Sequence, residues 1–300
     1  MKKQKLLLYV ILLMAMALPQ SVFAYDFSAV APTGQTLYYD ILSSTTVSVT
    51  CPNSGHLMNG WSGFSKPSGA LTIPSSVTYG GTTYAVTEIG EAAFRECSSL
   101  TSVTFPTSIV SIGDGSFYEC TGLTSITIPS AVSFIGGFAF SGCVGLTTVN
   151  YNADSCTTWN PVFDGDTNIT TINIGQNVKI IPGPIFYGCT GVTSITIPRK
   201  IKSIGGNAFR GCTNLTTVNF NADSCTNMGY ISDSNYVFYV FGSCNVTTVN
   251  IGSHVKMIPD GGFSGCTNLQ YVSSGYYNCR MVQSHSETRC NSKARLWKGV

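Results

Sequence analysis

Charged residues are scarce in this chain. Asp, Glu, Lys and Arg together make up 10% of its 300 residues, whereas an average soluble domain holds about 25%. Glu, Lys and Arg are therefore too few for long charged helices or a coiled coil. Lys2, Lys3 and Lys5 lie in an N-terminal leader, and the remainder carries 13 basic against 14 acidic side chains. That balance excludes the strongly basic surface expected of a nucleic-acid-binding protein.

Long apolar runs are also missing, apart from one near the N-terminus. Leu6–Leu18 is an unbroken apolar stretch of 13 residues that follows a basic start, and a membrane-spanning helix needs about 20. The sequence predicts a signal peptide over residues 1–24, cleaved between Ala24 and Tyr25. An uncleaved N-terminal anchor is the alternative. We therefore expect an exported protein, secreted or at the cell surface, whose mature chain has no transmembrane span.

Recognisable catalytic motifs are absent from the sequence, including a Gly-rich phosphate loop, Gly-x-Ser-x-Gly and His-Glu-x-x-His. The Asp-Ser-Cys triplet at 154–156 could supply a nucleophile, but such a cysteine needs a base, and no His recurs with the motif. A coil variant with an Asx-type turn is the favoured interpretation. Cys279, His285 and Cys290 match no metal-ligand spacing. No catalytic residue, metal site or cofactor is therefore predicted.

A repeat with a period of 23 organises most of the chain. The aliphatic column of this repeat reads Leu100, Leu123, Leu146, Ile169, Val192 and Leu215. The aromatic column reads Phe94, Phe117, Phe140, Phe163, Phe186 and Phe209. After an insertion near 229–240 the register resumes at Val246. A period in this range with Leu-x-x-Leu-x-Leu spacing is typical of a leucine-rich-repeat solenoid.

The residues of one repeat predict how each coil is built. Ile126 and Ile128 alternate with polar residues, which indicates a strand with one buried face, and Pro129 ends that strand. Gly136 supplies a turn that a side chain would strain. The Phe and Cys columns then close the coil on a short helical or 3₁₀ turn. Coils stacked about 4.8 Å apart would bury these residues as one continuous core.

The register divides the mature chain into three parts. We expect about eight 23-residue coils over residues 83–271, with a parallel β-sheet on one face. Residues 25–82 form a β-rich N-terminal cap segment, and residues 272–300 a basic, poorly ordered tail. A cap must shield the core of the terminal coil. The aromatic residues expected to do so are Tyr38, Tyr39, Trp61 and Phe64.

Cysteine is abundant, with 12 residues in the chain. Seven share one position of the repeat: Cys97, Cys120, Cys143, Cys189, Cys212, Cys244 and Cys266. Asp166 stands in the same column, and Cys244 falls one place out of it, which predicts a distorted coil there. The one-per-coil pattern favours packed thiols, although neighbouring coils would place the Cα atoms within bridging range.

The repeats resemble the BspA-like leucine-rich repeat family. The resemblance lies in LTSITIPSAV at 123–132 and SFIGGFAFSGC at 133–143, and it extends over about residues 25–272. Segments before the repeats contribute to it as well, namely 34–41, 47–52 and 71–86. The family is found in exported surface proteins of Bacteroides-type bacteria and some protists. The resemblance implies adhesion or protein binding at a cell surface, with ligands that differ between members.

A longer repeat is superimposed on the first. The segment 152–156 (NADSC) recurs three coils later at 221–225, and 173–182 recurs as 250–259 after the insertion. The coils therefore come in three kinds, which indicates duplication of a three-coil block. Duplication by block favours selection on an extended surface over a single catalytic pocket.

The outward positions of the predicted strands carry Ser, Thr and Asn and no charge. The candidate ligand-binding face consists of Ser125, Thr127, Thr148, Asn150, Thr171, Asn173, Ser194, Thr196, Thr217 and Asn219. One interpretation is structural, because Thr packs well between strands. The other is a flat hydrogen-bonding platform for a ligand. The insertion near 229–240 is the next candidate, because loops inserted into one coil often bind ligands.

The leading functional hypothesis is a non-enzymatic exported protein that binds a protein or glycan, such as a host matrix or cell-surface protein. The alternative is a structural envelope or matrix component that self-associates. A hydrolase is the least favoured class. A glycosidase would need paired carboxylates about 5–9 Å apart, and acidic residues are few.

Overall fold

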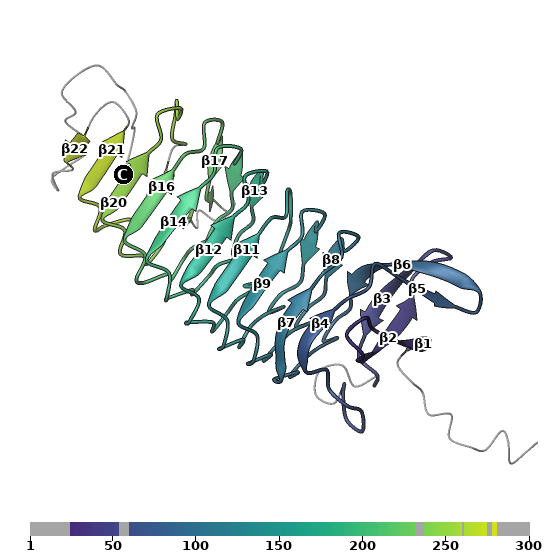
Figure 1. Cartoon of the computed structure of the whole chain (residues 1–300). Coiled ribbons are helices and arrows are strands. Elements are labelled where there is room, and N and C mark those ends of the chain that lie inside the picture. Colours follow the sequence, from purple (N-terminus) through teal and green to yellow (C-terminus); the bar gives the residue numbers. More distant parts are fainter. Residues whose placement is uncertain (1–24, 54–59, 232–236, 260, 275–277, 281–300) are drawn as a thin grey trace, which may run out of the picture.

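The computed structural model describes residues 25–53, 60–231, 237–259, 261–274 and 278–280. Within these ranges the regular elements are all strands, joined by turns. The coils stack into an elongated solenoid with the N-terminal strands at one end (Figure 1). The predicted signal peptide and most of the basic tail lie outside the described residues.

The N-terminal part begins as an antiparallel meander. Its strands are β1 (Phe27–Val30), β2 (Thr36–Ile41), β3 (Thr46–Thr50), β5 (Ser76–Tyr79) and β6 (Thr82–Ile89). β1 pairs with β2 and β2 with β3, both antiparallel, and β5 forms an antiparallel hairpin with β6. β3 then pairs parallel with β6, and β6 parallel with β8 (Ser111–Ile112) of the first coils. The N-terminal part therefore converts from antiparallel to parallel pairing before the repeats begin, and β6 crosses the expected boundary at residue 82.

One face of the solenoid carries the longer parallel strands. They are β4 (Gly69–Thr72), β7 (Leu100–Thr104), β9 (Ser125–Ile128), β11 (Thr148–Tyr151), β12 (Thr171–Ile174), β14 (Ser194–Ile197), β16 (Thr217–Phe220), β20 (Thr248–Ile251) and β21 (Tyr271–Ser274). The ladder is continuous within three sections, β4-β7, β9-β11-β12 and β14-β16-β20-β21. Within the second section residue i pairs with residue i+23, as Thr127 pairs with Asn150 and Asn150 with Asn173. The sequence period is therefore the register of the sheet.

A second column of short parallel strands runs along another side of the coils. It contains β8 (Ser111–Ile112), β10 (Phe134–Ile135), β13 (Ile180–Ile181), β15 (Ser203–Ile204) and β17 (Asn227–Met228). The sequence predicts only one sheet, so this column is an addition. Most of these strands place an Ile inward, and in several coils a Gly follows, as Gly113 and Gly136 do. A Cβ at Gly113 would lie 2.6 Å from the backbone nitrogen of Glu91. Glycine is thus needed for close approach of the coils at this position.

The turn that closes each coil is neither helical nor 3₁₀, contrary to the expectation from sequence. The N–H groups of alternate residues donate in two directions. The Phe94 N–H donates to the Ser116 carbonyl of the next coil at 2.7 Å. The Arg95 N–H donates to the Ala92 carbonyl within the turn at 3.0 Å. In several coils this turn has left-handed backbone at two places. Examples are Ala92 and Glu96, Gly115 and Glu119, Phe138 and Gly142, and Asn207 and Gly211. A helix cannot form because half of the N–H groups bond between coils.

The Phe column forms one stack along the whole solenoid. Neighbouring rings lie 5.0–5.9 Å apart and close to parallel from Phe94 to Phe263. Every ring in the stack is at most 1% exposed. Stacked aromatic pairs add to the free energy of burial itself. The column therefore forms the continuous core that the repeat predicts.

The Cys column packs beside this stack. The Cys120 thiol donates to the Phe94 carbonyl at 3.0 Å, and the Cys143 thiol to the Phe117 carbonyl at 3.2 Å. The nine described cysteines from Cys97 to Cys266 are free thiols and buried. Cys244 was expected to lie out of column, but its thiol donates to the Phe209 carbonyl at 3.0 Å in the same way. The inserted residues are therefore accommodated before Phe241 and Cys244. The turn between Cys244 and Val246 is one residue shorter than the one between Cys212 and Leu215.

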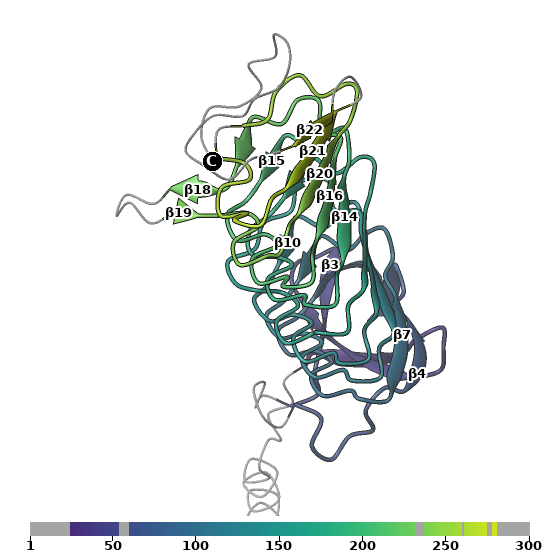
Figure 2. The same ribbon diagram turned by 90° about the vertical axis from the view of Figure 1, so that its left-hand side faces the viewer.

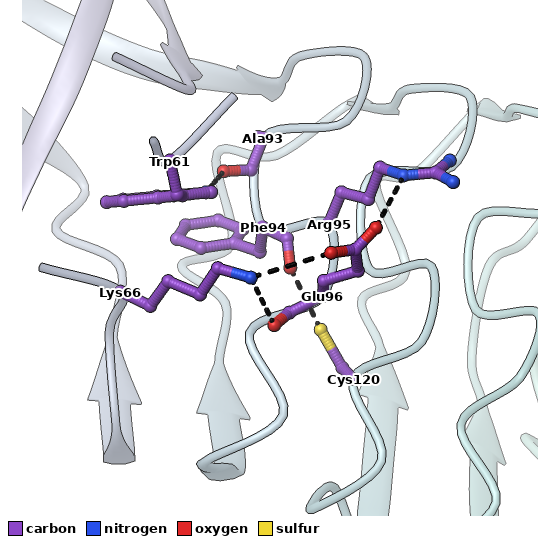
Figure 3. A network of polar contacts seen from close by, with 7 residues as sticks. All are labelled: Trp61, Lys66, Ala93, Phe94, Arg95, Glu96 and Cys120. Atoms are coloured by element: carbon purple, nitrogen blue, oxygen red, sulfur yellow. Dashed lines mark hydrogen bonds and ion pairs between the residues drawn. The ribbon is translucent and has the colours of Figure 1, made fainter. Parts of the chain in front are cut away.

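The N-terminal part docks on the first coil through a small polar and aromatic network (Figure 3). Trp61 lies against Phe94, with ring centroids 6.4 Å apart, and its indole N–H donates to the Ala93 carbonyl at 3.0 Å. The Lys66 ammonium donates to the Glu96 carbonyl at 3.0 Å and lies 3.6 Å from the Glu96 carboxylate. Tyr38 packs edge-on against Trp61. Trp61 and Tyr38 are buried and cover the end of the Phe stack, so they are core residues of the cap.

Two further hairpins depart from the repeat. The insertion forms β18 (Tyr230–Ile231) and β19 (Val237–Phe238), which pair antiparallel and stand out from the side of the solenoid (Figure 2). At the far end β22 (Asn278–Arg280) pairs antiparallel with β21. Both β21 and β22 fall at the start of the segment expected to be a tail. Antiparallel pairing of β22 ends the parallel ladder there.

Candidate ligand-binding face

The ten predicted face residues lie on five consecutive long strands, two on each of β9, β11, β12, β14 and β16. All ten are exposed or half-buried, while their neighbours in the strand point into the core. The strand alternation that the sequence shows is the reason for this division. The structure brings six of the ten into one hydrogen-bonded section and four into the next.

Side chains in the middle of this face bond to one another along the solenoid. The Asn150 amide donates to the Thr127 hydroxyl at 3.1 Å, and the Asn173 amide donates to the Asn150 carbonyl oxygen at 2.9 Å. The spacing between strands of about 4.8 Å places amides of equal side chains within bonding reach. Thr127, Asn150 and Asn173 therefore form a first polar ladder.

A second polar ladder continues in the next section. The Asn219 amide donates to the Thr196 hydroxyl at 3.3 Å, and the Asn250 amide donates to Asn219 at 2.8 Å. The Ser273 hydroxyl donates to Asn250 at 2.7 Å. Asn250 and Ser273 extend the face beyond the ten predicted residues. Ser273 could have been found by adding one coil period to Asn250.

The ladders change how the face can act. Each Asn already uses part of its hydrogen-bonding capacity on its neighbour, so few free donors or acceptors remain per coil. The same bonds hold the side chains in one arrangement before any ligand arrives, which lowers the entropic cost of binding. The face is uncharged, so it offers no long-range electrostatic attraction. It is suited to shape-matched contact over several coils.

The Asp-Ser-Cys coils hold no activated nucleophile. Burial raises the pKa of the Cys156 thiol to about 12, and the Cys156 thiol donates to the Thr157 carbonyl at 3.4 Å. Burial likewise raises the pKa of Cys225 to about 11. The thiolate is the reactive form of cysteine, and both groups are neutral thiols near pH 7. Their position in the second strand column is that of packing residues.

Among the described residues no group of three or more His, Cys, Asp or Glu side chains could hold a metal ion. The described part of the chain also has no helix that is long and apolar enough to cross a bilayer. The side chains of Cys279, His285 and Cys290 lie outside the described part of the chain.

The repeat itself matches a known family model. Six copies of the BspA type leucine rich repeat region match the chain, over residues 87–215, 159–233 and 179–293. The chain belongs to this family. The matched ranges cover well over half of its length, and they coincide with the coils whose strands pair one period apart. The resemblance drawn from the sequence is confirmed.

Solved structures of bacterial leucine-rich repeat proteins are similar to the chain. The T. pallidum leucine-rich repeat protein is 23% identical, with 84% of this chain and 90% of that one covered and a TM-score of 0.45. One from Bacteroides ovatus is 21% identical, with 83% and 76% covered and a TM-score of 0.38. A leucine rich cell surface protein from Faecalibacterium prausnitzii is 18% identical, with 83% and 96% covered and a TM-score of 0.33. No curated protein sequence matches the chain significantly.

Proposed function

We propose that this BspA-type repeat protein is an exported, non-enzymatic surface protein that binds a protein or glycan ligand through its long-strand face. Support comes from one observation above all: two polar ladders hold an uncharged set of Ser, Thr and Asn side chains in register over consecutive coils. Solenoids use such extended faces for binding. The family membership and the predicted signal peptide agree with a location at the cell surface.

The face is tested by introducing bulky charge into the first ladder. Thr127→Arg, Asn150→Arg and Asn173→Arg together should abolish capture of a ligand from extracellular matrix or host-surface extracts by the immobilised mature chain. Contact spread over several coils means that one substitution alone should weaken capture only slightly, since each hydrogen bond contributes about 0.5–1.5 kcal/mol. Weak dependence on salt should accompany binding, because the face has no charge.

A matched control lies six residues earlier in the same three coils. Thr121, Val144 and Thr167 are exposed and occupy one column before the strands. Arginine at these three positions adds the same charge and should leave capture unchanged. If both triple variants bind like the parent chain, the long-strand face is structural only. If the parent chain recovers only copies of itself, the self-associating matrix component becomes the better description.

A further inference from the structure

A groove lies where the long strands of the first coils end. It has a volume of about 610 Å³, and it is lined by the segments that follow β7, β9, β11 and β12. Cavities of roughly 300–1,000 Å³ are typical of small-ligand sites. The groove borders the long-strand face at Thr127. It is therefore a concave feature beside an otherwise flat surface.

Polar side chains with unused bonding capacity line this groove. The Asp154 carboxylate is 38% exposed, and its Oδ2 lies 3.8 Å from the Lys179 ammonium, which is beyond hydrogen-bonding distance. Its Oδ1 is buried and accepts no hydrogen bond from any described residue. Asn177 accepts from Lys200 at 2.7 Å through Oδ1, which leaves its amide N–H groups as donors. The groove thus offers the more exposed Oδ2 of Asp154 as an acceptor beside the Asn177 N–H donors.

An aromatic ring supplies the apolar part of the lining. Phe105 is partly buried and packs edge-on against Phe117 of the core stack, with centroids 5.8 Å apart. The same ring lines the groove. Positive and negative charge balance locally, since Lys179 lies beside Asp154. The lining therefore combines one apolar surface, several hydrogen-bonding groups and no net excess of charge.

The equivalent place in the next three-coil block is occupied by the protein itself. Arg199 stands three coil periods after Ser130, and Asp223 stands three coil periods after Asp154. Arg199 donates to the Asp223 carboxylate from Nη2 at 3.0 Å and from Nε at 3.3 Å. The Arg199 guanidinium thereby holds the pKa of Asp223 below its usual value. In the first block a serine cannot make this bond, and Asp154 keeps only its ion pair with Lys179 at 3.8 Å.

The backbones of the two places are the same. The Asp154 N–H donates to the Ser130 carbonyl at 3.2 Å, and the Asp223 N–H donates to the Arg199 carbonyl at 3.3 Å. A Cβ on the glycine of the following coil would lie 2.5 Å from the Asn oxygen in both blocks. The difference between the two places is therefore one of side chains. One arginine decides whether the carboxylate accepts hydrogen bonds within the chain, as Asp223 does, or keeps only an ion pair at 3.8 Å, as Asp154 does.

We propose that this groove binds a neutral sugar residue of a glycan. Sugar hydroxyls donate and accept at once, which suits a carboxylate next to amides, and the apolar side of a sugar ring can pack on Phe105. The balanced charge disfavours an anionic ligand. This inference rests on the proposed binding function and specifies its ligand class and site, at the edge of the long-strand face.

Saturation-transfer NMR and calorimetry on the mature chain test this site, with the methyl glycosides of glucose, galactose, mannose and N-acetylglucosamine as probes. At least one probe should bind, with a Kd in the millimolar range. Ser130→Arg should weaken its binding at least tenfold, because the new guanidinium pairs with Asp154 as Arg199 pairs with Asp223. Asp154→Asn should weaken it as well. The second block shows that the fold accommodates arginine at this position, so both variants should melt like the parent.

Two matched controls complete the experiment. Ala131→Arg adds the same charge one residue away, where the second block has Lys200, and it should leave binding unchanged. Arg199→Ser frees Asp223 and should leave the first site intact. Absence of binding by all four probes overturns the sugar assignment, and so does binding that Ser130→Arg and Asp154→Asn leave unaltered.

Failure of this inference can be told apart from failure of the proposed function. If no sugar binds but a protein ligand is captured and then lost on arginine substitution in the first ladder, only the sugar site is wrong. If Ser130→Arg abolishes capture of a protein ligand while no sugar binds, the groove is a peptide site and the sugar assignment falls. If sugar binds in the groove but the arginine substitutions in the first ladder leave ligand capture unchanged, only the proposal that the long-strand face binds the ligand fails.

Discussion

The two three-coil blocks of this solenoid share a core and differ at its edge. In the first block, residues 100–168, Phe140 is stacked between its neighbours at 5.1 and 5.3 Å. In the second block, residues 169–245, Phe209 is stacked in the same way at 5.4 and 5.5 Å. By contrast, the strand ends carry Ser130 in one block and Arg199 in the other. Inward positions are constrained by two neighbouring coils, whereas strand ends are free to diverge.

The Cys column shows one exception to this agreement inside the core. The first block has Asp166 where the second block has Cys244, and both side chains are buried. Burial raises the pKa of the Asp166 carboxyl to about 8, the nearby Asp164 adds to this, and N–H groups of Cys143 and Gly142 offset it in part. A thiol at this position donates to a carbonyl of the preceding coil without such a cost. The exchange therefore makes the two blocks differ in their response to pH.

The largest expected effect comes from restoring the thiol with Asp166→Cys. The unfolded chain releases the Asp166 proton near pH 3.8, whereas the folded chain keeps it to about pH 8. The free energy of unfolding should therefore fall by about 1.4 kcal/mol per pH unit across this window, on the order of 5 kcal/mol in total, and then level off. Asp166→Cys should remove that fall and raise stability at pH 8.

Denaturant unfolding of parent and variant at pH 4, 6 and 8 checks this sign. The difference between the two chains should be smallest at pH 4 and largest at pH 8. Cys244→Asp provides the reciprocal variant, and it should introduce the same dependence into the second block. A constant difference at all three pH values would mean that Asp166 ionises in the folded chain as it does in water.

The next effect tests whether the two cores are equal. Phe140→Ala and Phe209→Ala should each lower the free energy of unfolding by about 3–5 kcal/mol, because each removes a fully buried ring. Coils contact only their neighbours, so part of each loss should remain local. Hydrogen exchange should show deprotection concentrated in the coils next to the substitution. Coincident melts of variant and parent would contradict the inward assignment of this column.

The smallest effect compares the two polar ladders. Asn150→Ala and Asn219→Ala each remove one half-buried amide from a chain of side-chain bonds. Each loses one donated and one accepted hydrogen bond, so at about 0.5–1.5 kcal/mol per bond the cost should be about 1–3 kcal/mol. Thr121→Ala, an exposed change in the preceding turn, should stay within about 0.5 kcal/mol of the parent. Equal values for all three variants would show that the ladders add nothing to stability.

Much of the architecture could be predicted because the 23-residue period determines both the strand register and the inward columns. The period places Thr127 beside Asn150 once the coils stack, and the inward Phe column follows from the same arithmetic. The closing turn could not be predicted, since Glu119 and Phe138 adopt left-handed backbone that these residues rarely occupy. Bonds between coils impose that conformation against local preference. The second strand column was missed for another reason. Its Ile residues recur at the coil period, as Ile112 and Ile135 do, but a strand of two residues shows no alternation along the chain.

The candidate site, too, could be predicted from the sequence only in part. The outward Ser, Thr and Asn residues are visible in the sequence, because alternation along a strand assigns them to the exposed side. Their ladders depend on the spacing between coils, which sequence alone does not measure. The groove was not predicted, because it is formed by segments that lie one period apart in four successive coils. Its availability depends on Ser130, whose importance appears only beside the bond from Arg199 to Asp223.

The sequence by itself determined that this protein is a leucine-rich-repeat solenoid with aliphatic, aromatic and cysteine columns facing inward. A repeating pattern of side-chain size and polarity is sufficient for that, because each coil must bury its apolar residues against the next. The tertiary structure alone decided where N–H groups and carboxylates find partners. Those choices depend on small differences in distance between neighbouring coils. Trp61 therefore closes the Phe stack, Asp166 holds its proton in the core, and Asp154 in the groove keeps an ion pair with Lys179 but accepts no hydrogen bond at Oδ1.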